Sequence, residues 1–367
     1  MNKFKKIIIL FLIILVGFNV YGCKENKEES VDKKPLEYSS ELFPTDSSKF
    51  SSALAKLSLN YLSGTTSEET KIILENNGFE ILKQKNYDKA VDDPSHTTSF
   101  SIGKKNIIQN KESKELILVT LSTSLDNDWL SNFDFAPSHN NSTVFSENFL
   151  YCAMDVFSEL EPFIKNDSLI LVTGYSRGGA CANLLGMLLN ETYAGTNIYV
   201  YTFASPGTVR NYNMLYYNIF NIINESDIVK DLPFTNLGYS RLGYDIVLKN
   251  KSMIQINEEL LSVLTPLCPS ISSYYGDRHS LTSAGLNDNG LTMYEIAVIL
   301  ISSINSSDNG LQDALSLITI LSEESDLFPL YSKCHKLYTS GSFKKMGNEH
   351  NFNQYKTLLD NFTIEEN

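Results

Sequence analysis

Apolar runs alternate with amphipathic segments along the middle of this chain. Between the predicted strands, residues 146–165 and 178–190 have helical periodicity. Strands that are apolar throughout and alternate with helices are typical of a parallel sheet covered by helices on both faces. The pattern therefore predicts an α/β fold with a mostly parallel central sheet. The segments with strand-like length and composition are 98–103, 115–121, 168–174, 197–205, 216–224 and 238–249.

Helices are also predicted on either side of this region. One is expected from about 48 to 62, and a second from 67 to 76, where Thr66 and Glu69 have the spacing of a capping box. Two more are expected near 292–304 and 311–322, followed by a polar C-terminal segment. Because no internal repeat is apparent, residues 47–367 are predicted to form one domain with a helical extension from about 308.

The N-terminal 46 residues have a different character. A basic start is followed by an apolar stretch of 14 residues at 7–20, which is short for a membrane span and typical of a secretory signal. Gly22 and Cys23 after it resemble a bacterial lipobox. We therefore expect a lipoprotein signal peptide at 1–22, a diacylglyceryl group on Cys23 and a flexible, lipid-anchored tether at 23–46.

This N-terminus predicts an extracytoplasmic protein anchored to the membrane through Cys23. The alternative is a plain secretory signal with an incidental cysteine, which would release the protein. The formal net charge is −13, and it becomes −16 when the three lysines of the signal peptide are removed. So acidic a chain is unsuited to binding nucleic acid.

Five cysteines occur, and none of them has the CxxC spacing of a structural zinc site. The four cysteines after Cys23 are scattered through a large domain. Buried free thiols are therefore expected rather than disulfides. The four are Cys152, Cys181, Cys268 and Cys334.

The sequence "LILVTGYSRGGACANLL" at 169–185 joins a buried strand to a helix through a Gly-x-Ser-x-Gly turn. This order predicts a nucleophile elbow, in which Ser176 lies at a sharp turn above the sheet edge. The helix N-terminus favours developing negative charge there, and the Arg177 N–H is placed to donate to an oxyanion. The alternative is an ordinary strand-to-helix turn made of small residues.

A nucleophilic serine needs a base, and the base needs a carboxylate that orients it. In α/β-hydrolases these groups follow in the order serine, acid, histidine. Three histidines come after Ser176, namely His279, His335 and His350. Position in the sequence alone does not choose among them.

Four segments resemble motifs of the class 3 lipases, an α/β-hydrolase family that includes the fungal triacylglycerol lipases. "TGYSRGGACANLLG" resembles the nucleophile block, and "NIINESDIVKDLP" resembles the acid block written N-x-x-D-x-V-x-x-L-P. "VYTFASPGTV" resembles the strand usually written TFGSPRVG, and "LILVTLSTSLDNDWLSNF" resembles FRGTxSxxDWxxD. The resemblance spans about residues 98–285. It implies an α/β-hydrolase fold and hydrolysis of acyl esters.

The resemblance also implies particular residues for the acid and the base. It selects Asp227 as the acid, with Asp231 as the competitor nearer to the Leu-Pro pair. The family histidine follows the later strands, and His279 in "GDRHSLTS" fits that place, with His335 the next candidate. His279 would then accept the proton of Ser176 and donate to Asp227.

Two features upstream of the elbow are implied by the same resemblance. Alignment on the tryptophan places Thr123 as the second oxyanion-hole donor. Fungal relatives carry their lid at the segment that is 125–140 here, which contains an apolar group among acidic residues. The alternative for this group is a packed surface helix whose aromatic side chains belong to the core. The group consists of Trp129, Leu130, Phe133 and Phe135.

The leading hypothesis is a serine hydrolase of carboxylic esters, acting on acylglycerols or other acyl lipids through an acyl-enzyme. A small-ester esterase or an acyltransferase would use the same triad. A non-catalytic surface lipoprotein on a lipase scaffold is the third possibility, because two family motifs are altered here: FRGT appears as "TLST" at 120–123, and VHxGF appears as "VFSENF" at 144–149. The mechanism requires no metal or organic cofactor. The expected partners are a lipid or ester substrate and a membrane; no oligomeric state is predicted.

Overall fold

The computed structural model describes residues 42–87, 97–122, 144–193, 197–232, 239–249, 254–264, 336 and 339–362. Several predictions fall outside these ranges: the signal peptide with Cys23, Thr123, the apolar group at 129–135, His279, His335, and the helices near 292–304 and 311–322. Among the described residues, no helix is both long enough and apolar enough to cross a membrane.

A central sheet runs through the described part of the chain in the order β1-β2-β3-β5-β6-β8-β10. β1, β2 and β3 pair antiparallel, whereas β3, β5, β6, β8 and β10 are all parallel. The strands are β1 (Glu80–Lys85), β2 (Ser99–Gln109), β3 (Glu112–Ser122), β5 (Leu169–Tyr175), β6 (Asn197–Phe203), β8 (Ile219–Asn224) and β10 (Tyr244–Leu248).

Continuous apolar strands form because the sheet is covered on both faces, so that alternate side chains enter two different cores. On β3, Ile117 and Val119 belong to one core, while Leu116 and Leu118 belong to the other. The neighbouring strand β5 divides its side chains in the same way. All four of these β3 side chains are fully buried.

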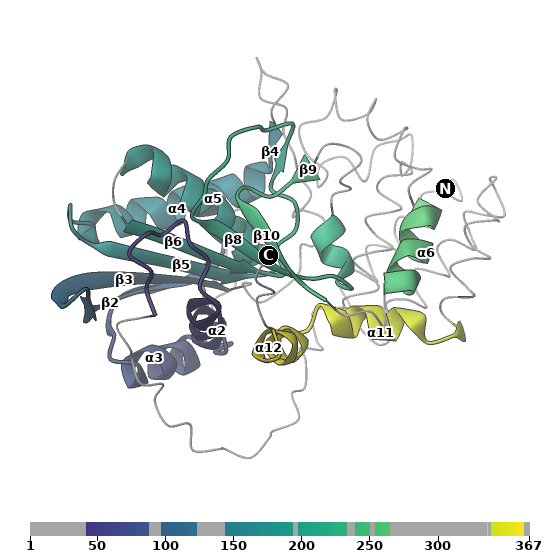
Figure 1. Cartoon of the computed structure of the whole chain (residues 1–367), viewed down its shortest axis with the longest axis horizontal. Coiled ribbons are helices and arrows are strands. Elements are labelled where there is room, and N and C mark those ends of the chain that lie inside the picture. The colour runs from purple at the N-terminus through teal and green to yellow at the C-terminus, as the bar shows by residue number, and fades with distance from the viewer. Residues whose placement is uncertain are drawn as a thin grey trace, which may run out of the picture.

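Helices cover both faces of this sheet (Figure 1). On one face lie α4 (Glu147–Leu160) and α5 (Arg177–Thr192). On the other lie α2 (Ser52–Tyr61), α3 (Ser67–Asn76) and α12 (Phe352–Asp360). This arrangement, with the serine turn between β5 and α5, is an α/β-hydrolase fold and confirms the predicted fold class.

The smaller elements lie around this framework. α11 (Ser342–Glu349) contacts both α12 and α6 (Ile254–Leu264). A separate antiparallel sheet has the order β4-β7-β9. Its strands are β4 (Val144–Phe145), β7 (Val209–Arg210) and β9 (Tyr239–Ser240), and the 3-10 helices are η4 (Glu161–Phe163) and η5 (Ile228–Asp231).

The predicted capping box is confirmed at the start of α3. The Thr66 side chain accepts a hydrogen bond from the Glu69 N–H at 3.2 Å, and the Glu69 carboxylate accepts one from the Thr66 N–H at 3.3 Å. The helix predicted from about 48 begins instead at Ser52, because Ser51 has extended backbone and its side chain caps the Leu54 N–H.

Predicted strand boundaries differ from those observed in several places, and three of the differences lie at residues with positive φ. β2 continues to Gln109 and joins β3 through Asn110 and Lys111, both at positive φ, as a two-residue hairpin requires. β6 ends at Phe203 because the next residue also adopts positive φ. The segment predicted as one strand at 238–249 is split by Gly243, where φ is +84° and a Cβ would lie 2.2 Å from the Ile219 carbonyl oxygen.

Candidate active site

Ser176 lies at the sharp turn between β5 and α5. Its backbone has φ 54° and ψ −121°, a conformation that costs a non-glycine residue about 1–3 kcal/mol and must be held by its surroundings. The Ser176 N–H donates to the Phe203 carbonyl at 2.8 Å, and the Ser176 carbonyl accepts from the Ala180 N–H at 3.0 Å. The turn is therefore fixed on one side by β6 and on the other by the first turn of α5.

The glycines of the motif are required by close approach of the backbone. A Cβ at Gly174 would lie 2.1 Å from the Gly178 carbonyl oxygen, and a Cβ at Gly178 would lie 2.3 Å from the Leu121 carbonyl oxygen. Real Cβ atoms do not approach backbone that closely. The structure therefore confirms that both positions must lack a side chain for β3, β5 and α5 to meet at Ser176.

Asp227 follows the end of β8 and precedes η5, and its side chain has no exposure to solvent. One carboxylate oxygen, Oδ1, accepts from the Val229 N–H at 2.9 Å. The other, Oδ2, accepts from the Tyr355 hydroxyl at 2.6 Å and lies 2.8 Å from His350 Nδ1. Asp231, the competing acid, pairs instead with Lys230 Nζ at 2.6 Å.

His350 lies between the serine and the carboxylate. Its Nε2 is 2.9 Å from Ser176 Oγ, and its Nδ1 is 2.8 Å from Asp227 Oδ2. Because an ionised carboxylate only accepts, Nδ1 carries the proton and Nε2 is left to accept the serine hydroxyl proton. The geometry is that of a base poised to take a proton from Ser176.

The position between Ser176 and Asp227, for which the sequence analysis favoured His279, holds His350. Both ring nitrogens of His350 are engaged by Ser176 and Asp227, so another imidazole cannot occupy the same position. His279 and His335 lie outside the described residues. His350 was one of the three histidines that chain order allowed, and its C-terminal neighbours carried no motif that distinguished it.

The backbone around His350 is tied to two strand ends. The Tyr175 hydroxyl, next to the serine, donates to the His350 carbonyl at 2.5 Å. At the end of β8, the Asn224 side-chain amide donates to the Glu349 carbonyl at 2.9 Å and to its carboxylate at 2.8 Å. Burial, and to a smaller extent the Asp227 charge, raise the pKa of Tyr175 well above its usual value, so Tyr175 remains a neutral donor.

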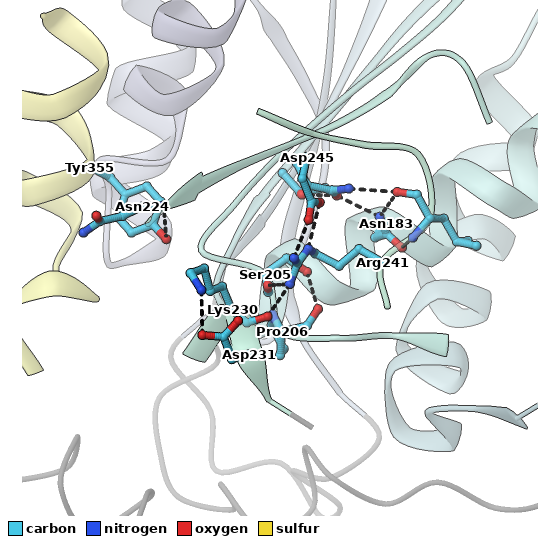
Figure 2. A network of polar contacts seen from close by, with 12 residues as sticks. Asn183, Ser205, Pro206, Asn224, Lys230, Asp231, Arg241, Asp245 and Tyr355 are labelled. Carbon is cyan, nitrogen blue, oxygen red and sulfur yellow. Dashed lines mark hydrogen bonds and ion pairs between the residues drawn. The ribbon is translucent and has the colours of Figure 1, made fainter. Parts of the chain in front are cut away.

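Arg241 holds the loop that carries Asp227. Figure 2 shows its buried side chain lying between Asp245 and Ser205. The guanidinium donates to the Asp245 carboxylate at 3.0 Å and 2.5 Å, to the Ser205 carbonyl at 3.2 Å and to the Lys230 carbonyl at 2.5 Å. η5 is thereby attached to the end of β6, close to the serine turn.

Arg177 is the first residue of α5, where backbone N–H groups have no acceptor within the helix. Its side chain turns into the body of the protein and does not extend over Ser176. The guanidinium lies 3.4 Å from the Thr97 carbonyl oxygen, 3.5 Å from Cys152 Sγ and 5.6 Å from the centre of the Phe149 ring. Donation to an oxyanion, the role predicted for Arg177, therefore falls to its backbone N–H and not to its guanidinium.

The second predicted oxyanion donor, Thr123, lies outside the described residues. The described chain reaches Ser122 at the end of β3, and Leu121 pairs with Gly174 in the adjacent strand. The described end of β3 thus lies beside the serine turn. The predicted lid group lies in the same undescribed segment.

Cys152 and Cys181 are buried free thiols, as predicted. Burial raises the pKa of the Cys152 thiol, but the hydrogen bond with Cys181 and the nearby Arg177 charge outweigh burial and lower it overall. Cys268 and Cys334 fall outside the described residues. Within the described ranges, no group of three or more histidine, cysteine, aspartate and glutamate side chains is placed to hold a metal ion.

Comparison with known proteins points to lipases. A family model described as Lipase (class 3) matches residues 117–237, about a third of the chain. That range includes Ser176 and Asp227 and ends before His350. The match supports the resemblance to class 3 lipases and, with the site geometry, supports a carboxylic ester hydrolase. No curated protein matches the sequence.

Three solved structures illustrate the similarity. A Rhizomucor miehei lipase propeptide complex with a two-residue deletion is 17% identical, with a TM-score of 0.41, over 55% of this chain and 68% of that chain. A lipase from Rhizopus microsporus var. chinensis is 18% identical, with a TM-score of 0.40, over 62% and 86%. The Lip2 lipase from Yarrowia lipolytica is 17% identical, with a TM-score of 0.38, over 54% and 78%.

The steric requirement at the turn is testable by substitution. We expect Gly178→Ala to lower the free energy of unfolding by about 3 kcal/mol, because the new Cβ meets the backbone of Leu121. Gly186→Ala is the control and should lose less stability, because its Cβ would meet side-chain atoms of Val200 at 2.9 Å and Ile219 at 3.1 Å instead of backbone, and alanine favours the helix. Urea unfolding measures both. Equal losses in the two variants would contradict the assignment.

Proposed function

We propose that this chain is a serine hydrolase of carboxylic esters related to the class 3 lipases, with Ser176, His350 and Asp227 as its catalytic triad. The observation that carries the proposal is the position of His350, which is within hydrogen-bond distance of both other residues. Two further observations support it. Ser176 has the strained backbone of a nucleophile elbow, and the Asp227 carboxylate is buried and hydrogen-bonded, as an orienting acid requires.

In the first half of the reaction, Ser176 Oγ attacks the ester carbonyl carbon while its proton passes to His350 Nε2. The resulting imidazolium is stabilised by the Asp227 carboxylate at Nδ1. Negative charge develops on the carbonyl oxygen, where the Arg177 N–H at the helix N-terminus and the Thr123 N–H would donate. As the tetrahedral intermediate collapses, the C–O bond to the alcohol breaks, and the alcohol leaves with the proton from His350.

In the second half, His350 takes a proton from water, and the hydroxide so formed attacks the acyl carbon bound to Ser176. The second tetrahedral intermediate uses the same oxyanion donors. Its collapse breaks the acyl–Oγ bond and returns the proton from His350 to Ser176. The carboxylic acid is released and the enzyme is regenerated, with every proton transfer made by groups of the chain itself.

The proposed triad predicts a specific pattern of inactive variants. We expect Ser176→Ala, His350→Ala and Asp227→Asn each to lower kcat for p-nitrophenyl esters by about 1,000-fold or more. His279→Ala and His335→Ala are the matched histidine controls and should retain wild-type kcat. Labelling of Ser176 by a fluorophosphonate should follow the same pattern.

Two outcomes of this experiment would contradict the proposal. Loss of activity in His279→Ala or His335→Ala with retention in His350→Ala would show that another histidine is the base. Failure of the folded wild-type protein to react with the fluorophosphonate would favour a binding protein built on a hydrolase scaffold.

We propose acyl lipids as the substrate class. The proposal is supported by the family match and by the apolar residues at 129–135, for which the resemblance implies a lid. For p-nitrophenyl esters of increasing acyl length, kcat/KM should be at least as high for octanoate and palmitate as for butyrate. Long acyl chains offer more apolar surface to bury in the transition state, and each buried methylene stabilises it by about 0.8 kcal/mol. A sharp preference for butyrate would indicate a small-ester esterase.

We further propose that the mature protein is extracytoplasmic and held at the membrane by lipid on Cys23. In a bacterial host supplied with labelled palmitate, the wild type should incorporate label and sediment with membranes. Cys23→Ala should do neither, because the thiol that receives the diacylglyceryl group is gone. Cys334→Ala is the control and should behave as wild type. Release of unlabelled wild type would indicate a plain secretory signal.

A further inference from the structure

Tyr355 occupies a position that the proposed mechanism does not use. Its side chain is fully buried in α12, and its hydroxyl donates to Asp227 Oδ2 at 2.6 Å. The Tyr355 hydroxyl oxygen in turn accepts from the Asn224 N–H at 3.0 Å, at the end of β8. Figure 2 shows Tyr355 facing Asn224. The hydroxyl therefore has one fixed donor and one fixed acceptor, which leaves a single orientation for its proton.

Asp227 Oδ2 is the oxygen that also faces His350 Nδ1. Two donors thus converge on one oxygen while the Val229 N–H holds the other. A carboxylate with both oxygens engaged cannot rotate about its Cβ–Cγ bond without breaking a buried hydrogen bond. The direction from which Asp227 approaches the imidazole is set by these contacts.

We propose that Tyr355 is a positioning residue of the ester hydrolase. Its hydroxyl orients the Asp227 carboxylate and, by donating to Oδ2, reduces the negative charge that Oδ2 directs at His350. The inference rests on the proposed function, since it concerns the same triad. Tyr355 does not touch the reacting atoms, and its effect passes through Asp227 and His350.

The ionisation state of Tyr355 is consistent with this role. Burial, together with the nearby Asp227 charge, raises the pKa of Tyr355 well above its usual value, so the phenol remains a neutral donor. The same segment is held by Asn224, whose amide binds Glu349. The charged or titratable groups near Asp227 and His350 include Tyr175 of β5, Glu349 of α11, Tyr355 of α12 and Arg241 beside β9. In η5, which follows Asp227, Lys230 and Asp231 pair with each other at 2.6 Å.

Two consequences distinguish positioning from simple packing. Without the Tyr355 donor, Asp227 is less firmly oriented, so the transition state loses stabilisation and kcat falls. Asp227 also presents more of its negative charge to His350, which favours the protonated, inactive imidazolium. Because activity requires neutral His350, the acid limb of the kcat/KM profile should move to higher pH.

The experiment compares Tyr355→Phe with Tyr201→Phe. Tyr201 is also fully buried, and its hydroxyl also accepts a backbone N–H, that of Ser51, at 3.0 Å, but Ser51 is the N-cap residue of α2 and does not belong to the triad. Both variants lose a buried hydroxyl and leave a backbone N–H without that acceptor. Only Tyr355→Phe removes a donor from the carboxylate.

For Tyr355→Phe, kcat per fluorophosphonate-labelled site should fall about 10-fold with KM little changed, and the acid limb should move up by a few tenths of a pH unit. Tyr201→Phe should match wild type in both measurements while losing comparable stability. Unchanged kcat and pH profile in Tyr355→Phe, or equal changes in both variants, would overturn the inference. A wild type that neither hydrolyses esters nor accepts the label would instead overturn the proposed function.

Discussion

The buried carboxylate of Asp227 is the constraint on which the rest of the site depends. An unpaired carboxylate without solvent is too costly to retain in a folded protein, so donors must be brought to it. They come from its own loop, through Val229, and from the C-terminal helices, through His350 and Tyr355. Satisfying one charge therefore attaches a distant part of the chain to the strand ends and places an imidazole beside Ser176.

The serine turn provides the fixed side of this arrangement. Its strain is sustained because β3, β5, β6 and α5 meet there without side chains between them, as the close approaches at Gly174 and Gly178 show. Tyr175, adjacent to the serine, also holds the backbone of His350. The same turn thus positions the proposed nucleophile, supplies the Arg177 N–H and fixes the base, so displacement of the turn would disturb all three.

Local signals in the sequence predicted the parallel sheet, the glycine-flanked turn and the α3 capping box, because apolar runs and short polar motifs report on nearby structure. The resemblance to class 3 lipases selected Asp227 as the acid. His350 was not selected, since it pairs with residues 174 and 123 positions away and the sequence around it was predicted only as a polar C-terminal segment. Tyr355 was missed for the same reason, because its role arises only from the tertiary contact with Asp227.

The pairing of His350 with Asp227 is the central claim, and proton NMR of the resting protein tests it most directly. A proton shared between Nδ1 and a buried carboxylate should resonate downfield of all backbone amides. We expect such a resonance in the wild type and in His279→Gln, and its loss in His350→Gln. A resonance that persists in His350→Gln and disappears in His279→Gln would contradict the account.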